Sequence, residues 1–110
     1  MINILIIKSG SDIMTIEATG HSGYAESGKD IVCSAVSSLM QSLAVGLTDV
    51  VKIPTNIKID EEYAHMHIEI QDKHDSKMRD AQILMHTTAL SLRAVADGYT
   101  KYIKIKEKQQ

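Results

Sequence analysis

The sequence predicts an α+β fold, a two-layer sandwich in which a mainly antiparallel sheet carries two helices on one face, in the order ββαββαβ. Several short segments alternate apolar and polar residues, which is typical of strands with one face in water. Two longer segments have the spacing of amphipathic helices, and turn-forming residues separate the segments. Because the chain has 110 residues, a single domain over residues 1–110 is expected.

A hairpin is predicted at the start of the chain. Residues 2–7 are apolar and mostly β-branched, and the polar cluster 9–12 separates them from the alternating run IMTIEAT at 13–19. This second strand is expected to bury Met14, Ile16 and Ala18 on one face. Its other face, with Thr15, Glu17 and Thr19, is expected to lie in water.

A long helix is predicted from Asp30 to about Lys52, with Asp30 as its N-cap or an acid of its first turn and Pro54 beyond its end. Its apolar stripe has the helical period: Val32, Val36, Leu39, Met40, Leu43, Leu47 and Val50. The alternating pattern then returns and predicts a second hairpin that turns at residues 60–62. Its apolar positions are Ile57 and Ile59 on one arm and Ala64, Met66, Ile68 and Ile70 on the other.

A second amphipathic helix follows, for which Asp75 or Ser76 is the expected cap and Gly98 the expected C′ residue. Its apolar stripe is Met78, Ala81, Met85, Ala89, Leu92 and Ala96. The segment TKYIKIK predicts a last strand with Ile103 and Ile105 facing inward.

Composition excludes several classes of function. A net charge of −2, with no Trp or Phe to stack on bases, argues against direct binding of nucleic acid. The sequence has no run of about 18 uninterrupted apolar residues, the length that a membrane-spanning helix needs. The apolar run ILII is too short for a signal-peptide core. The single cysteine can form no intramolecular disulfide, so we expect a cytoplasmic protein.

That cysteine, Cys33, falls in the first turn of the long helix, where unpaired N–H groups and the helix dipole favour a thiolate. It lies at the margin of the apolar stripe, next to Ser37 one turn on. His21 ends the second strand and can act as an acid or a base near neutral pH. The loop between them contains Gly20, Gly23 and Gly28, so it can bring the two side chains together or move. The alternatives are an inert core cysteine and a surface histidine.

His65, His67 and Glu69 alternate along one strand face, a spacing that could hold a metal. We expect an exposed polar face instead and no metal site, because spacing supplies no third histidine or cysteine.

The segment GHSGYAESGKDIVCSAVSSL, residues 20–39, resembles the signature of the ribosomal-processing cysteine protease family of Gram-positive and related bacteria. G-H-x-G-Y-A, followed by G-x-D-I-V-C and a serine four residues on, carries the resemblance, and length and element order extend it over essentially the whole chain. Two positions depart from the usual pattern, since Ser22 and Ser34 stand where alanine is common.

The resemblance implies a cytoplasmic, homodimeric endopeptidase that needs no cofactor. It would remove the short N-terminal extension of a large-subunit ribosomal protein during ribosome maturation, cutting after a hydrophobic stretch that contains phenylalanine. By position, Cys33 would be the nucleophile and His21 its acid/base partner, with Asp30 and Ser37 in support. A substrate-gating loop would comprise Gly20, Ser22, Gly23, Tyr24 and Gly28. From a different class, the alternative is a non-catalytic ribosome-assembly interaction module in which Cys33 only packs.

Overall fold

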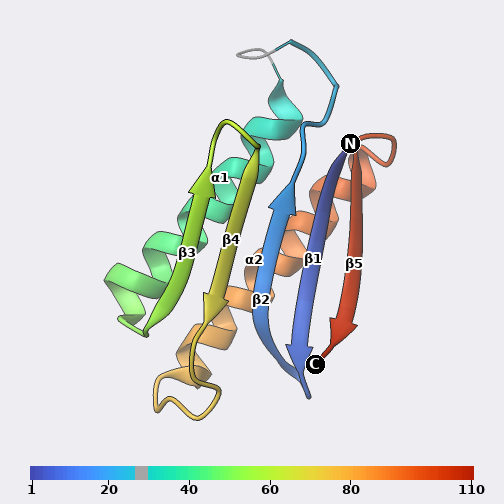
Figure 1. The fold of residues 1–110 in the computed structure, drawn as a ribbon. Helices are drawn as coiled ribbons and strands as arrows, with labels where there is room; N and C mark the ends of the chain where they lie inside the picture. The colour runs from blue at the N-terminus through green and yellow to red at the C-terminus, as the bar shows by residue number, and fades with distance from the viewer. Residues whose placement is uncertain (27–29) are drawn as a thin grey trace.

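A computed structural model of the chain describes residues 1–26 and 30–110. One five-stranded sheet carries two long helices on a single face (Figure 1). The strands are β1 Ile2–Ser9, β2 Asp12–Thr19, β3 Thr55–Asp60, β4 His65–Ile70 and β5 Ile103–Gln109. The helices are α1 Ile31–Val45, continued by the π-helical segment η1 Gly46–Val51, and α2 Met78–Gly98. The predicted order ββαββαβ is confirmed.

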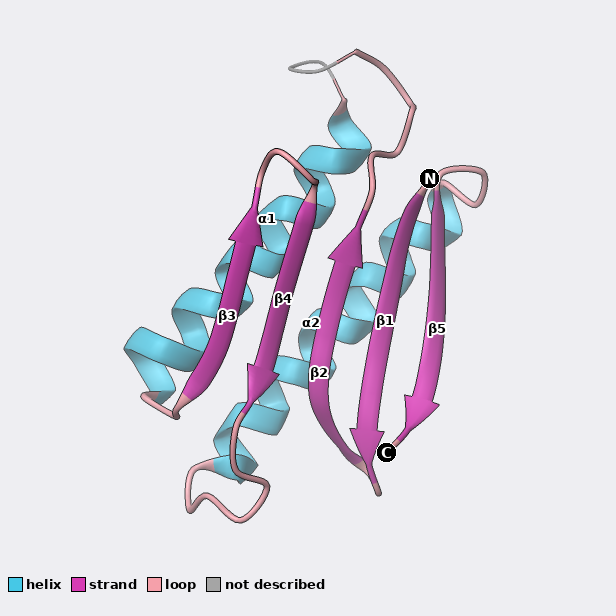
Figure 2. Ribbon diagram, in the orientation of Figure 1, coloured by secondary structure: helices cyan, strands magenta, loops and turns pink. Residues whose placement is uncertain are grey.

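The strands are ordered β3-β4-β2-β1-β5 across the sheet. β1 and β2, β2 and β4, and β3 and β4 pair antiparallel, whereas β1 and β5 pair parallel. The parallel pair forms because α2 crosses behind the sheet between β4 and β5 and returns the chain to the outer edge of β1 (Figure 2). The prediction of a mainly antiparallel sheet with both helices on one face is therefore confirmed.

The hydrophobic core lies between the sheet and the helices. Ile4 and Ile6 of β1 stand opposite Ala18 and Ile16 of β2, and all four are buried. From the helix side, the core receives Val32, Val36, Met40, Leu43, Met85 and Leu92. Apolar strand faces and helix stripes thus meet as their periods predict.

The strict alternation predicted for β2 is wrong near its start. The pairing register with β1 shifts between Ile7 and Lys8, so that Met14 has no partner and forms a bulge. As a result Ile13, Met14 and Thr15 are all buried. The side-chain amide of Gln82 on α2 accepts from the Ile13 N–H at 2.7 Å and donates to its carbonyl oxygen at 2.8 Å. This side chain satisfies backbone groups at the bulge.

The end of the first helix also departs from its predicted stripe. Val50 is 74% exposed, because the winding changes from α to π at Gly46 and the wider turn rotates later residues out of phase. By length and composition alone, Ile31–Val51 could cross a membrane, a test that core helices of many folds also pass. Here the stripe from Val32 to Leu47 packs in the core.

Four local predictions in the second half of the chain need correction. Ala64 has φ of +48° and belongs to the β3–β4 turn, not to the apolar face of β4. Ile59 is half exposed, because β3 is an edge strand. Gly98 is the last residue of α2 and not a left-handed C′ residue, since the C-cap position falls on Tyr99. The cap predicted for α2, Asp75 or Ser76, is also wrong, because the N-cap is Lys77 and its side chain makes no capping hydrogen bond. Asp75 instead accepts a hydrogen bond from the Lys77 N–H at 2.8 Å in the turn before the helix.

Candidate active site

The front of α1 is built on Asp30, the predicted N-cap. Its Oδ1 accepts hydrogen bonds from the N–H groups of Val32 and Cys33, each at 3.0 Å, which satisfies two of the free donors of the first turn. Asp30 is only 8% exposed. The N-cap prediction is confirmed, and it places Cys33 in the first turn of a well-formed helix.

Ser22 joins the loop to this helix front. Its N–H donates to the Sγ of Cys33 at 3.3 Å, and its hydroxyl donates to Oδ2 of Asp30. The same hydroxyl accepts from the N–H of Tyr24 at 3.1 Å, and the Ser22 side chain is buried. Sequence reasoning placed Ser22 in the loop but missed this role, because a contact between loop and helix depends on the tertiary path of the chain.

These contacts act on the charge of Asp30. Burial raises the pKa of the Asp30 carboxyl, but hydrogen bonds from Ser22, Cys33 and Ala25 outweigh it and lower the pKa to about 2 from the usual 3.8. The buried Asp30 carboxylate therefore stays ionised while it accepts the hydrogen bond from the Cys33 N–H.

The start of the loop is held in place at Gly20 and His21. The Gly20 N–H donates to the carbonyl of Ala64 in the β3–β4 turn at 2.9 Å, and the amino group of Met1 donates to the carbonyl of His21 at 2.5 Å. Gly20 has φ of +92°, and a Cβ built there would lie 2.5 Å from the Met1 carbonyl oxygen. Glycine is required at this position for both reasons.

A cavity of about 530 Å³ opens between the loop, the front of α1 and the β3–β4 turn. Its lining includes six of the residues predicted for the site: Gly20, His21, Gly23, Asp30, Cys33 and Ser37. Cys33 is half-buried against the core and His21 is exposed, so one side chain is sheltered while the other faces solvent. Within residues 1–26 and 30–110, no hydrogen bond joins the His21 ring to the thiol.

The opposite wall of the cavity was not predicted. Asp60 at the end of β3 lines it together with Glu61 and Ala64 of the β3–β4 turn. No local pattern marks a hairpin tip as part of a distant site; the hydrogen bond between Gly20 and Ala64 brings it there. Two acidic residues therefore line the same cavity as the thiol.

Tyr24 lies away from the cavity lining. Its ring makes edge-on contacts with Tyr99 and Tyr102, at centroid distances of 5.6 and 5.3 Å, where α2 passes into β5. The loop is therefore attached to the opposite side of the molecule from the β3–β4 turn. Gly28, also predicted for the loop, lies outside the described residues.

One chemical role is not open to the backbone of Cys33 in this arrangement. The N–H of Cys33 would be a natural donor to a substrate oxyanion, but here it donates to Asp30. The rest of the geometry, a half-sheltered thiol at a helix N-terminus and an imidazole at the same cavity, suits nucleophilic attack on a carbonyl followed by proton transfer. Catalytic hydrogen bonds are often long in the absence of substrate.

Residues 1–104 match the family model of the cysteine protease Prp. The chain belongs to this family of cysteine proteases. Within the family, it is 26% identical to the ribosomal processing cysteine protease Prp of Staphylococcus aureus over 104 residues, covering 94% of this chain and 95% of the relative. The relative from Bacillus subtilis is 24% identical over 94 residues, covering 84% of each chain.

A solved structure has the same fold. The crystal structure of S. aureus Prp in complex with a covalently linked product peptide superposes with a TM-score of 0.88 at 24% identity, covering 98% of this chain and 100% of the other. The likeness shows that the fold is shared. The sequence resemblance and the predicted fold class are both confirmed.

Proposed function

We propose that this Prp family member is an endopeptidase that removes the N-terminal extension of a large-subunit ribosomal protein, with Cys33 as nucleophile and His21 as acid/base. One observation carries the assignment of the dyad: the Cys33 thiol at the front of α1 and the His21 side chain line one cavity. The relatives named as ribosomal processing proteases support the class of substrate. A cavity of about 530 Å³ has room for several residues of an extended peptide.

In the proposed first step, the Sγ of Cys33 attacks the scissile carbonyl carbon as a thiolate, and a tetrahedral oxyanion forms. His21, protonated, then gives its proton to the leaving amine as the C–N bond breaks, which leaves a thioester on Cys33. A water molecule attacks the thioester while His21 takes its proton. The thiolate departs, and the new carboxyl terminus is released.

Asp30 supports this chemistry by position. Its carboxylate caps α1 and orients the turn that carries Cys33, and its bond to Ser22 holds the loop against that turn. Ser37 lies one helical turn beyond Cys33 on the cavity wall, where it would face the bound peptide. Both are positioning residues in this proposal.

The loop of Gly20, Ser22, Gly23 and Tyr24 would act as the substrate gate. Its start is bonded to the β3–β4 turn and its Tyr24 packs on Tyr99 and Tyr102. Edge-on aromatic contacts of this kind contribute only about 0.5–1.5 kcal/mol each beyond burial, so an entering peptide could displace Tyr24. Gly28, outside the described residues, belongs to the same proposed loop.

The state and location of the protein are further parts of the proposal. The family resemblance supports a homodimer, and the single cysteine supports a cytoplasmic location, where ribosomal proteins are made. We propose no direct contact with nucleic acid or membrane, in keeping with the net charge of −2.

The test incubates the protein with the extended ribosomal protein of its own host and reads the product masses. The unsubstituted protein should release one short N-terminal peptide, and Cys33→Ala should bind the substrate but leave it intact. Ser38→Ala, which alters an exposed serine of α1 outside the cavity lining, should cut normally. Cleavage by Cys33→Ala would overturn the dyad. If the folded protein cuts nothing and its thiol reacts with iodoacetamide only after unfolding, the chain is the non-catalytic assembly module.

A further inference from the structure

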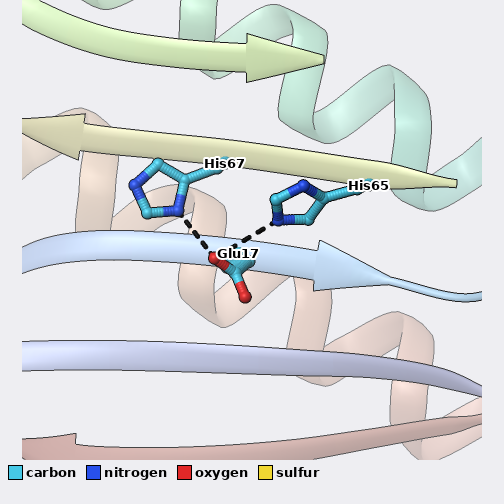
Figure 3. A group of neighbouring side chains, drawn as sticks. All are labelled: Glu17, His65 and His67. Carbon is cyan, nitrogen blue, oxygen red and sulfur yellow. Dashed lines mark hydrogen bonds and ion pairs between the residues drawn. The ribbon is translucent and has the colours of Figure 1, made fainter. Parts of the chain in front are cut away.

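A second group of reactive side chains lies on the sheet face opposite the helices (Figure 3). Glu17 extends from β2, and His65 and His67 extend from β4. Oε2 of Glu17 lies 2.7 Å from Nδ1 of His67 and 3.4 Å from Nε2 of His65. One possible ligand atom from each of the three side chains lies within 4.8 Å of the others.

The strand register creates this cluster. Glu17 pairs directly with His67 across the β2–β4 ladder, while Thr19 pairs with His65, so that His65 is the diagonal neighbour of Glu17. His65 and His67 share a face because they are two residues apart on one strand. From the spacing in the sequence, only His65, His67 and Glu69 of the same strand could be placed on this face. The fold supplies a third ligand, Glu17, from another strand.

We propose that Glu17, His65 and His67 bind a zinc ion. Two imidazoles and one carboxylate form a known set of protein ligands for Zn²⁺ in sites that keep the fourth position for water. The side chains are 29%, 33% and 20% exposed, in that order, so an ion and its water can reach them from solvent. Ca²⁺ and Mg²⁺ fit poorly, because these ions prefer a shell made only of oxygen ligands.

The distances suit a tetrahedral ion. Bonds of about 2.0–2.2 Å in tetrahedral geometry separate ligand atoms by about 3.4 Å. Glu17 and His65 already stand 3.4 Å apart. Glu17 and His67, hydrogen-bonded at 2.7 Å, would have to separate slightly, which rotation of the Glu17 side chain permits.

Glu69 supplies the outer contact that zinc-bound histidines usually make. The Nε2 of His67 lies 3.7 Å from Oε1 of Glu69, on the side of the ring away from Glu17. With Nδ1 on the metal, Nε2 carries the ring proton, and a small rotation of the Glu69 side chain would close the 3.7 Å to a hydrogen bond that fixes the tautomer and the ring direction. Glu69 therefore acts through His67 and does not itself bind the ion.

A bound ion would join the two hairpins of the sheet. β2 belongs to the first hairpin and β4 to the second, and their pairing is the joint between them. Because a ligand that binds only the folded chain stabilises it by mass action, zinc should raise the midpoint of thermal unfolding. The proposed ion holds the sheet together, and one of its ligands, His65, also lines the active-site cavity.

The test uses the full-length Cys33→Ala protein, because a thiolate would itself bind zinc. Calorimetric titration with ZnCl₂ near neutral pH should give one ion per chain. Binding should be lost in His65→Gln and in His67→Gln, each made in this background, and kept in His74→Gln, which changes an exposed histidine outside the cluster. Glu69→Gln should weaken the affinity by roughly tenfold or more.

Two further measurements complete the test. Co²⁺ in place of zinc should give the visible absorption of a tetrahedral complex in the Cys33→Ala protein and in His74→Gln, and this absorption should be missing from His65→Gln and His67→Gln. Far-ultraviolet circular dichroism of each metal-free variant checks that the sheet persists, and His→Gln was chosen to keep side-chain volume. The proposal is overturned if Cys33→Ala binds no zinc, or if His65→Gln and His67→Gln bind it as tightly as their parent.

Discussion

The backbone N–H of Ser22 donates a hydrogen bond to the Sγ of Cys33 across 3.3 Å, while the hydroxyl of the same serine donates to Asp30. A single loop residue therefore contacts both the proposed nucleophile and the cap of the helix that carries it. The first contact uses the backbone, which any residue at this position could supply. Only the second depends on the serine side chain.

This division predicts the effect of Ser22→Ala. The variant loses the hydroxyl bonds to Asp30 and Tyr24, and the buried Asp30 carboxylate loses one donor. We expect the free energy of unfolding to fall by about 1–3 kcal/mol, measured by urea denaturation. Peptide cleavage should continue at a similar rate, because the N–H contact to Cys33 remains.

Ser38→Ala is the matched control for this variant, since Ser38 lies exposed on α1. It should leave stability nearly unchanged. If Ser22→Ala is no less stable than Ser38→Ala, the hydroxyl does not support the cap.

Removing the cap itself should cost stability at the front of α1. Asp30→Ala leaves the N–H groups of Val32 and Cys33 without their acceptor, so we expect a loss of about 0.5–2 kcal/mol in the free energy of unfolding. Asp30→Asn retains a side-chain oxygen that can accept from both groups, so it should recover the part of the loss that comes from the cap but not the part that comes from the ionised carboxylate. Equal losses for Ala and Asn would mean that the charge matters more than the cap.

The lowered pKa of Asp30 predicts an acid dependence of stability. Folding favours the ionised carboxyl, whose pKa is about 2 in the folded protein against 3.8 ordinarily. The unfolded chain thus binds more protons between these values. The stabilisation is complete above pH 3.8 and is lost as the pH falls from 3.8 through 2.

Urea titrations at several pH values measure this effect as the difference in unfolding free energy between the unsubstituted protein and Asp30→Asn. The difference should shrink within the window from pH 3.8 to pH 2. Taking the difference removes the contribution of every other titrating group. A constant difference across the window would show that Asp30 titrates normally in the folded protein.

His21→Ala tests the acid/base role. Because general acid/base catalysis contributes typically about 10²–10⁴-fold, we expect kcat for peptide cleavage to fall by about that factor. Alkylation of Cys33 by iodoacetamide near neutral pH should also slow. His74→Ala, an exposed histidine away from the cavity, is the control and should leave both rates unchanged.

The front of α1 could be predicted because its signals are local. An N-cap aspartate, a helical stripe and a cysteine three residues after the cap lie next to one another in sequence, and the structure keeps them so. The end of the same helix could not be predicted, because the change to π winding at Gly46 rotates Val50 outward. At Gly46 the helix passes so close to Leu84 of α2 that a Cβ would lie 2.8 Å from that side chain.

Contacts between distant segments were the other part that sequence did not reveal. The bond of Gly20 to Ala64 places the β3–β4 turn over the cavity, and the pairing of Glu17 with His67 completes the side-chain cluster on the open sheet face. Each depends on strand order and register. A period or a motif predicts which residues share a face, but not which face of another strand they meet.

Gly20→Ala should be the most damaging single change at the start of the loop. The residue combines a φ of +92° with a backbone carbonyl oxygen 2.5 Å from where the Cβ would lie, so the chain must shift at Met1 or at the loop. Gly23→Ala is the matched control, because Gly23 has φ of +73° and no atom within 4 Å of an added Cβ. Gly23→Ala should therefore cost only the strain of a left-handed backbone, about 1–2 kcal/mol, without any steric clash.

We expect Gly20→Ala to lose more free energy of unfolding than Gly23→Ala in urea denaturation, and to cleave peptide more slowly at saturating substrate. The reason is that a shift at Gly20 displaces the adjacent His21, whose carbonyl is held by the Met1 amino group. Equal effects of the two variants on stability and on cleavage would mean that the close approach to Met1 plays no part in placing the histidine.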